Sequence, residues 1–268
     1  MTLSLQRFYL KMDHKILKNQ KILVVGAAGL LGSSLVKELL SCGATVVAAD
    51  LSTSLIDTRF SSIGISSKDS DVSYHEINLL DKESVAAIFK MHLGLSGGVN
   101  CSYPRNNNYG KHFFDVSVDD FNNNVSMNLG SSFLFMQECA RYFQSSNTPF
   151  SLVNISSIYG VVAPKFHIYK NTKMTTPVEY VAIKAGLANL SKYVVKYVND
   201  SRFRVNLVSP GGLYDRQPSQ FLNAYKRETL GRGMLDSSDI LGSIIFLLST
   251  MSQYVNGQNI IVDDGFIL

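Results

Sequence analysis

Short apolar segments recur along this chain, and almost every one is followed by a longer segment of helical character. The apolar segments are rich in Val, Ile and Leu and lie at 21–25, 44–49, 72–77, 150–155, 203–208 and 259–262, with a weaker one at 96–100. Helices are expected at 30–41, from 81 onward, and at 117–145, 177–199 and 236–250. Strands separated by helices pair in parallel through right-handed crossovers, and continuous apolar strands are typical of a sheet covered on both faces. The pattern predicts an α/β fold with a single doubly wound parallel sheet.

The length of 268 residues allows one large domain or two small ones. No Pro/Gly/Ser-rich linker divides the chain, so residues 21–268 are expected to form a single domain after an N-terminal lead-in at 1–20. Charged residues such as Arg7 and Lys11 interrupt the lead-in, which indicates no signal peptide. No apolar run approaches the roughly 20 residues of a membrane helix, so no membrane partner is expected.

Composition excludes several further classes. With 46% hydrophobic and 17% charged residues, the chain is expected to fold rather than remain disordered. A net charge of +4 without a basic stripe does not favour nucleic-acid binding. Three cysteines without a CxxC motif indicate neither a disulfide framework nor a zinc site, and fit a reducing cytoplasm. The five histidines show no ligand spacing, so no metal is expected.

A glycine-rich turn joins the first strand to the first helix. Gly26, Gly29 and Gly32 form the pattern GxxGxxG, with Leu30 and Leu31 between the last two. Gly26 would permit the tight turn, Gly29 the approach of a pyrophosphate to the backbone, and Gly32 close helix–strand packing. The helix N-terminus would then face the phosphates. Such a turn also occurs for steric reasons alone, but this context indicates a dinucleotide-binding, Rossmann-type sheet.

Asp50 ends the second strand, 18 residues beyond Gly32. A carboxylate there can accept hydrogen bonds from an adenosine ribose and repels a 2′-phosphate. The first basic residue after it is Arg59. We therefore expect NAD(H) to be favoured over NADP(H), the alternative for Asp50 being a solvated strand end.

Two further segments carry reactive side chains. Ser157 lies in a Ser-Ser-x-x-Gly segment after a strand, where the spacing to Gly160 favours Ser157 over Ser156. Tyr180 and Lys184 form a YxxxK motif at the head of a helix, so both side chains share one face. A nearby ammonium lowers a phenol pKa, which is expected to make Tyr180 a general acid/base.

In combination these motifs resemble the short-chain dehydrogenase/reductase family from Lys21 to Leu268. The motifs that carry the resemblance are the glycine turn, Asp50, Asn100, Asn128-Leu129, Ser157, Tyr180 with Lys184, Ser209-Pro210-Gly211 and Val262-Asp263-Asp264-Gly265. The resemblance implies that Tyr180 exchanges the substrate proton, that Lys184 assists it and holds the nicotinamide ribose, and that Ser157 orients the substrate oxygen. It also implies that Asn128 bends its helix and holds a water linked to Lys184. The remaining cofactor contacts that it implies are Gly26, Gly29, Leu30, Leu31, Gly32, Asp50, Asn78, Leu79, Asn100, Pro210, Gly211 and Leu213.

Several positions depart from the family pattern. The usual Asn-Asn-Ala-Gly reads Asn100-Cys101-Ser102-Tyr103 here, so Tyr103 introduces bulk where a glycine is usual. Asn78 replaces an Asp, and Asp215 replaces a Thr. Ser157 and Tyr180 are 23 residues apart, a wider spacing than is usual, so an insertion at 161–178 is expected to loop over the active site.

The insertion and a second loop, 103–111, are rich in polar and aromatic residues and favour a hydroxylated substrate over a steroid or fatty acyl chain. The three lysines of the insertion could bind an anionic or sugar-like ligand, or the segment could be a solvated or oligomer-contacting loop. At closer range the wording NCSYPRN, SSIYGVVAPKFHIY and YVNGQNIIVDDGF resembles one subgroup of the family, the flagellin modification protein A-type reductases of bacterial surface-glycan clusters linked to legionaminic-type sugars.

The sequence therefore indicates an NAD(P)-dependent oxidoreductase that interconverts an alcohol and a ketone on a sugar or nucleotide-sugar. An NAD-dependent sugar epimerase on the same scaffold and a non-catalytic nucleotide-binding subunit remain alternatives. The resemblance further implies a homodimer or homotetramer, and the apolar C-terminal run Phe266-Ile267-Leu268 fits burial against a partner.

Overall fold

A single parallel sheet organises the part of the chain described by this computed structural model, residues 15–268. Its strands are β1 (Lys21–Val25), β2 (Thr45–Asp50), β3 (Val72–Glu76), β4 (Gly97–Asn100), β5 (Phe150–Ile155), β6 (Phe203–Pro210) and β7 (Asn259–Val262). Their order is β3-β2-β1-β4-β5-β6-β7, and every neighbouring pair is parallel. This confirms the predicted fold class. Most of the predicted lead-in, residues 1–14, lies outside the described residues.

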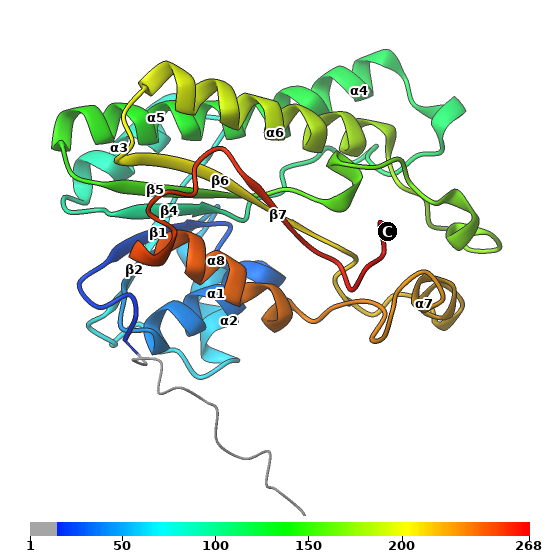
Figure 1. Ribbon diagram of the computed structural model, residues 1–268, viewed down its shortest axis with the longest axis horizontal. Coiled ribbons are helices and arrows are strands. Elements are labelled where there is room, and N and C mark those ends of the chain that lie inside the picture. The colour runs from blue at the N-terminus through cyan, green and yellow to red at the C-terminus, as the bar shows by residue number, and fades with distance from the viewer. Residues whose placement is uncertain (1–14) are drawn as a thin grey trace, which may run out of the picture.

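Helices cover both faces of the sheet (Figure 1). One layer contains α1 (Leu30–Ser41), α2 (Thr53–Ser61) and α8 (Leu241–Leu248), and the other contains α3 (Lys82–Met91), α5 (Ser131–Ser146) and α6 (Val178–Val198). Helix α4 (Val118–Val125) leads into α5, and α7 (Ser219–Lys226) lies beyond the end of β6. Because both faces are covered, the central strands are almost entirely buried, and all eight positions of β6 are.

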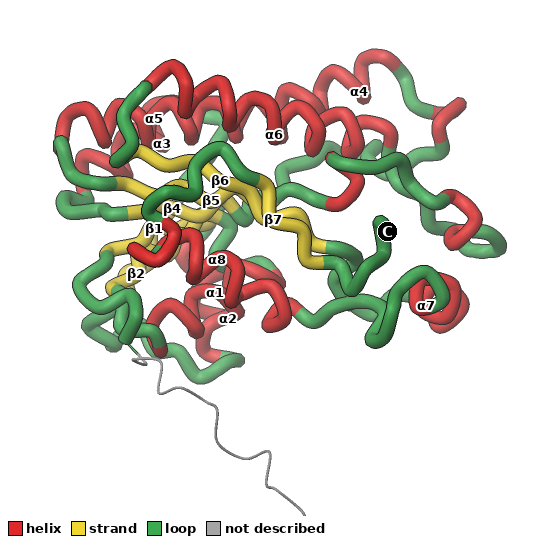
Figure 2. Tube along the Cα trace, in the orientation of Figure 1, coloured by secondary structure: helices red, strands yellow, loops and turns green. Residues whose placement is uncertain are grey.

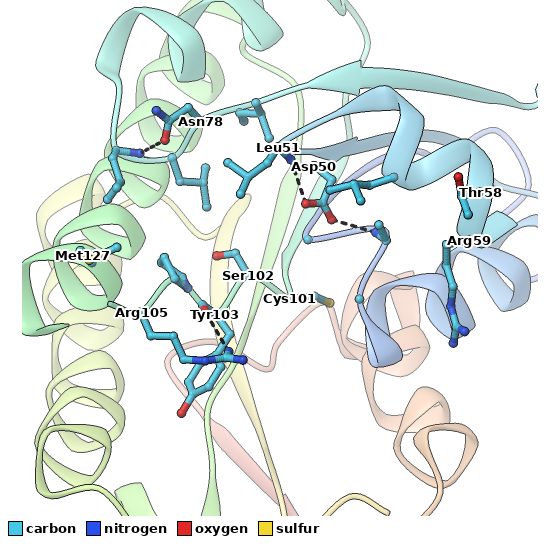
Figure 3. Close-up of a pocket in the computed structure, with 18 of the residues that line it drawn as sticks. Asp50, Leu51, Thr58, Arg59, Asn78, Cys101, Ser102, Tyr103, Arg105 and Met127 are labelled. Atoms are coloured by element: carbon cyan, nitrogen blue, oxygen red, sulfur yellow. Dashed lines mark hydrogen bonds between the residues drawn. The ribbon is translucent and has the colours of Figure 1, made fainter. Parts of the chain in front are cut away.

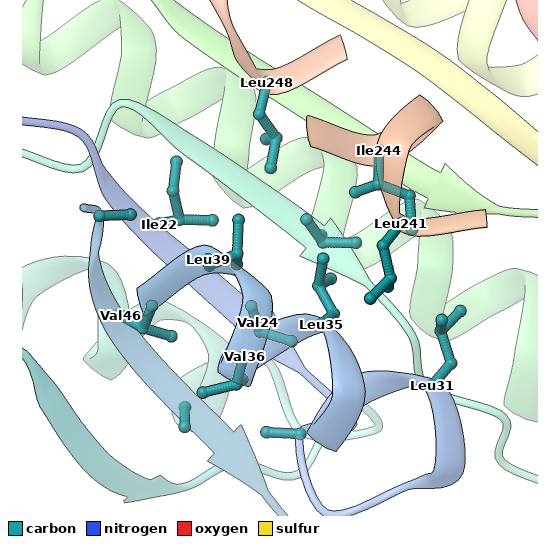
Figure 4. Close-up of a cluster of buried hydrophobic side chains, with 14 of the residues drawn as sticks. Ile22, Val24, Leu31, Leu35, Val36, Leu39, Val46, Leu241, Ile244 and Leu248 are labelled. Atoms are coloured by element: carbon teal, nitrogen blue, oxygen red, sulfur yellow. The ribbon is translucent and has the colours of Figure 1, made fainter. Parts of the chain in front are cut away.

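Each layer has its own apolar core. On the α1 side, Leu35 and Leu39 pack with strand residues such as Val24 and with Ile244 of α8 (Figure 4). On the opposite side, Phe135 of α5 packs with Phe89 of α3 and with Leu187 of α6. Full burial of such a side chain contributes roughly 1.5–3 kcal/mol of hydrophobic free energy. The two cores hold the strands in register and so fix where each strand ends.

Three elements differ from the sequence prediction. Helix α2 was not predicted, because it buries only Ile56 and Phe60 and has a largely polar surface. Helix α7 was not predicted either, and buries only Phe221 and Tyr225. The predicted helix at 117–145 is interrupted by a π-helical turn at Ser126–Gly130.

The carboxyl ends of all strands lie at one edge of the sheet, because every strand runs in the same direction. Chain order reverses between β1, which pairs with β2, and β4, which pairs with β5. A crevice at such a reversal is the usual ligand site of an open α/β sheet. Long loops extend from this edge toward α7 and the C-terminus (Figure 2).

Candidate active site

The glycine turn between β1 and α1 is tightly packed against its neighbours. Gly26 has a φ of +76°, and a Cβ there would lie 2.8 Å from the backbone of Cys101 and Ser102. A Cβ on Gly32 would overlap the carbonyl of Gly26, so close packing of helix on strand requires glycine there, as predicted. Gly29 is the N-cap of α1 and provides no side-chain cap. The first-turn N–H groups of α1 therefore lack a capping side chain, which suits an anion.

Asp50 is fixed at the end of β2 by two backbone N–H groups. Its Oδ2 accepts from Ala28 N and its Oδ1 from Leu51 N, each at 2.8 Å. The first bond joins the carboxylate directly to the glycine turn. The two features that predicted a dinucleotide site are thus brought together at the reversal of strand order.

A cavity of about 810 Å³ opens beside this turn (Figure 3). Gly26, Gly29, Asp50, Asn78 and Leu79 are the predicted cofactor residues that line it. Residues that sequence reasoning missed also line it, namely Ile77, Leu51, Leu55, Thr58, Arg59, Ser62, Leu80, Pro104, Arg105 and Met127. Several of these belong to α2, whose weak apolar pattern concealed it.

Other predicted cofactor residues lie outside the lining of this cavity. Leu30, Leu31 and Gly32 belong to α1, and only Leu30 is exposed. Asn100 is buried and bonded to its own loop and to α5, since its Oδ1 accepts from Ser102 Oγ at 2.6 Å and its Nδ2 donates to Ser132 Oγ at 3.3 Å. Asn100 therefore shapes the loop after β4.

Pro210 is the last residue of β6, and Gly211 and Leu213 lie just beyond it. A Cβ on Gly211 would lie 2.9 Å from the hydroxyl of Tyr225, which shows how closely α7 approaches. Tyr225 also accepts a hydrogen bond from Gly212 N at 2.6 Å. These contacts fix the segment beyond β6 on the same sheet edge as the loop after β5.

Ser157, Tyr180 and Lys184 converge at that edge. Ser157 follows β5 and hydrogen-bonds to the phenol of Tyr180. The ammonium of Lys184 lies 5.6 Å from the Tyr180 ring centre and donates to Ile155 O at 2.9 Å. The YxxxK spacing on α6 therefore does place both side chains on one helical face.

The pKa of Tyr180 differs from the sequence expectation. Burial raises it above its ordinary value, and the hydrogen bond from Ser157 offsets only part of this rise. The expected lowering by Lys184 is not found, since Lys184 is not among the causes of the Tyr180 shift. Burial also lowers the pKa of Lys184, to about 8, because desolvation acts against the charged forms of both groups. In this structure, Tyr180 is a protonated phenol at neutral pH.

Asn128 lies within the π-helical turn that interrupts its helix. Its backbone carbonyl accepts from Ser131 Oγ and Ser132 Oγ, and its Nδ2 donates to Pro104 O at 3.4 Å. The side chain thus contacts the loop after β4.

The insertion at 161–178 packs beside Tyr180, and two of its basic side chains, Lys165 and His167, contact other parts of the chain. Lys165 Nζ lies 3.0 Å from Glu228 Oε2 and donates to Phe266 O, and His167 Nε2 lies 2.9 Å from Glu228 Oε1. Tyr169 packs on Phe221 of α7, with ring centres 5.0 Å apart. Lys165 therefore joins the insertion to the segment after α7 and to the C-terminus, and is not a free anion ligand.

Comparison with known proteins identifies the family. The sequence family described as enoyl-(acyl carrier protein) reductase matches residues 26–267. Post-translational flagellin modification protein A of Campylobacter coli is 33% identical over 94% of this chain and 99% of its own length. The 7alpha-hydroxysteroid dehydrogenase of Bacteroides fragilis is 27% identical over 94% and 95% of the two chains.

Among solved structures, a short chain dehydrogenase from Leptospira borgpetersenii with bound NAD+ superposes with a TM-score of 0.82. Its sequence is 28% identical to this one, and the superposition covers 94% of each chain. The chain belongs to the short-chain dehydrogenase/reductase family and is an oxidoreductase of that family. Within residues 15–268, no helix is long and apolar enough to cross a membrane. Within the same residues, no three His, Cys, Asp or Glu side chains gather as metal ligands would.

Proposed function

We propose that this enzyme interconverts an alcohol and a ketone on a sugar or nucleotide-sugar, using NAD(H) in preference to NADP(H), in bacterial surface or flagellar glycan biosynthesis. The observation that carries the proposal is the convergence of Ser157, Tyr180 and Lys184 at the same sheet edge as the Asp50 cavity. The similarity to a flagellin modification protein supports the glycan role.

The residues present fit a nicotinamide dinucleotide. The uncapped N-terminus of α1 suits the pyrophosphate, and the fixed carboxylate of Asp50 suits the adenosine ribose. The similar Leptospira structure contains NAD+. When bound, such a cofactor exchanges hydride with the substrate carbon.

The chain's own residues then handle the proton and the substrate oxygen. In ketone reduction, Tyr180 donates its proton to the oxygen as the alcohol forms, and in oxidation it accepts that proton. Ser157 hydrogen-bonds to the same oxygen and orients it. Lys184 holds a positive charge beside the phenolate that remains, and is proposed to hold the nicotinamide ribose with Tyr180. The raised pKa of Tyr180 keeps its proton in place at neutral pH, which suits reduction.

The test is turnover on a substrate panel. We expect absorbance change at the nicotinamide band with nucleotide-activated or free amino sugars, and none with a 7α-hydroxysteroid. Tyr180→Phe should lower kcat by roughly 10²–10⁴-fold, the usual contribution of a general acid, and should change the Kd for NADH far less than it changes kcat. Tyr254→Phe is the matched control, because Tyr254 is an exposed tyrosine in the segment before β7.

Other outcomes of this test separate the alternatives. Turnover of the steroid but of no sugar contradicts the proposed substrate class. Tight NADH binding without net oxidation or reduction of any sugar favours the epimerase or the non-catalytic subunit.

We also propose a homo-oligomer, a dimer or tetramer, in the cytoplasm. Tyr193 and Tyr197 on α6 and Phe133 on α5 are exposed aromatic side chains on one helical layer. The three cysteines are free, which fits a reducing compartment. Light scattering should give at least twice the 29.6 kDa chain mass, and Tyr197→Glu should lower it. A monomeric mass for the wild-type protein contradicts this proposal.

A further inference from the structure

Tyr103 stands between the cavity and the catalytic side chains. It lines the cavity, whereas neither Tyr180 nor Lys184 does (Figure 3). Its ring packs edge-to-face on Tyr180, with ring centres 5.6 Å apart. The ammonium of Lys184 lies over the same ring, 5.6 Å from its centre. The phenol ring of Tyr103 therefore separates the space beside Asp50 from the space beside Lys184.

The distances leave no room for a ligand between Tyr103 and Lys184. A sugar ring inserted there would need about 3.5–4 Å of van der Waals separation on each side, roughly 7–8 Å in total. The observed separation is 5.6 Å. Lys184 itself is only 5% exposed, and its ammonium lies over the rings of Tyr103 and Tyr180 while donating to Ile155 O. A ribose that binds Lys184 must therefore displace the Tyr103 ring.

The backbone of the Tyr103 loop is anchored more firmly than the ring. Fully buried Asn124 accepts from Asn106 N at 2.9 Å, and its Nδ2 donates to Asn106 Oδ1 and to Glu179 Oε1. These bonds fasten the loop to the first turn of α6, next to Tyr180. The ring itself is held by side-chain contacts alone. Besides those with Tyr180 and Lys184, its hydroxyl and ring contact Tyr109, and the guanidinium of Arg105 lies 5.1 Å from the ring centre.

Tyr103 is also partly open to solvent, with 36% of its surface exposed. The ring can therefore rotate outward while the anchored backbone stays in place. Such a rotation breaks the contact with Tyr109 and the aromatic contact with Tyr180, each of which has a modest free energy.

We propose that Tyr103 is a specificity-determining residue that admits the adenine-nucleotide half of a cofactor freely and yields only to the ribosyl-nicotinamide half. This inference rests on the proposed function. In the structure as it stands, an adenine nucleotide reaches the cavity beside Asp50 without any movement of Tyr103. The nicotinamide half reaches Lys184 only when the ring has moved, so part of its binding free energy is used to displace the ring.

The test compares ADP with NADH by calorimetric titration of the full chain. Tyr103→Ala should tighten NADH binding by roughly tenfold, the order expected from the loss of one aromatic pair and one cation–π contact. The Kd for ADP should stay within about twofold. Tyr109→Phe, which removes only the hydroxyl contact, should tighten NADH binding by less and leave ADP unchanged. Tyr254→Ala serves as the surface control, because Tyr254 is 90% exposed.

A kinetic measurement gives a second readout. In stopped-flow mixing with the wild-type protein, the observed rate of NADH binding should level off at high concentration, because ring displacement becomes limiting. In Tyr103→Ala it should rise linearly, as it should for ADP in both proteins.

The outcomes separate this inference from the proposed function. If Tyr103→Ala weakens NADH binding, or changes NADH and ADP by the same factor, Tyr103 is an ordinary wall of the site and the inference is wrong. If neither ADP nor NADH binds the wild-type protein or the variant, the proposed function itself is contradicted, together with the inference that rests on it.

Discussion

Lys184 is the residue whose burial most affects the chemistry of the site. It is 5% exposed, and its pKa is lowered to about 8 mainly by desolvation, with no carboxylate among the causes. Burying an ammonium costs free energy that only its charged form incurs. Below pH 8 the folded protein therefore bears the cost of a buried charge.

This predicts a pH dependence of stability. Because the folded pKa of about 8 lies below the unfolded value of 10.5, the unfolded state binds more protons between these limits. The contribution of Lys184 to the free energy of unfolding should therefore rise with pH from about 8 to 10.5. In urea unfolding, the free energy of unfolding of the wild type should rise relative to that of Lys184→Met as the pH increases from about 8 to 10.5.

Lys192→Met is the control, since Lys192 is an exposed lysine on the same helix. It should follow the wild-type curve. A Lys184→Met difference that does not change with pH contradicts the assignment of a buried, depressed lysine.

The placement of a site residue was predictable where short-range spacing decides it, and its environment was not predictable where packing decides it. The i, i+4 spacing of Tyr180 and Lys184 sufficed to place both on one face of α6. The predicted direction of the Tyr180 pKa shift was wrong, because the shift depends on burial beneath side chains distant in sequence, Tyr103 among them. Tyr103 was recognised as bulky, but the sequence could not show that its ring contacts the catalytic pair.

At the scale of elements, a pair of histidines joins β3 to the end of α3. His75 and His92 pack edge-to-face with ring centres 4.3 Å apart, and the Nε2 of each is buried without a hydrogen-bond partner. Burial, together with the charges of His75 and Lys21, lowers the pKa of His92 to about 4. Protonation of His92 therefore opposes this contact.

We expect His92 to make the protein acid-sensitive. Its folded pKa of about 4 lies below the ordinary 6.5, so the unfolded state binds more protons and stability falls as pH drops from 6.5 to 4. His92→Phe keeps an aromatic edge and removes the titration, so its stability should fall less over this range in urea unfolding. Exposed His112→Phe is the control. An unchanged acid dependence in His92→Phe would show that the pair is not responsible.

Elements with a strong apolar pattern were predictable, and those with little buried surface were not. The strands and α1 follow from their Val, Ile and Leu content. Helix α2 buries only two side chains, yet it supplies Leu55, Thr58 and Arg59 to the cavity. These three lining residues were therefore missed for the same reason that the helix was.

At the scale of the whole molecule, one aromatic cluster joins three distant segments. Phe266 is fully buried near the C-terminus, stacks on Tyr225 of α7 at 4.5 Å and lies 4.6 Å from Lys165 Nζ of the insertion. Tyr180 packs against the same cluster. The C-terminal segment thus packs with the insertion and α7 in one cluster beside Tyr180. Phe266 is buried within its own chain, so its burial does not require the partner that the apolar C-terminal run was predicted to contact.

Removing the Phe266 side chain should destabilise the protein. Phe266→Ala leaves a cavity between the insertion and α7 and should cost about 3–5 kcal/mol in the free energy of unfolding. Phe114→Ala, at a phenylalanine that is 96% exposed, should stay within about 0.5 kcal/mol of wild type. Equal effects of the two substitutions in denaturant titration contradict a joining role for Phe266.

The central claim is that the space beside Asp50 and the glycine turn holds an NAD-type dinucleotide for Tyr180. Calorimetric titration of the wild-type protein with NADH and with NADPH tests it most directly. We predict that NADH binds at least about tenfold more tightly, since an extra 2′-phosphate would meet the fixed Asp50 carboxylate, and tenfold corresponds to about 1.4 kcal/mol. Tighter binding of NADPH contradicts the role given to Asp50, and the absence of binding by either nucleotide contradicts the account as a whole.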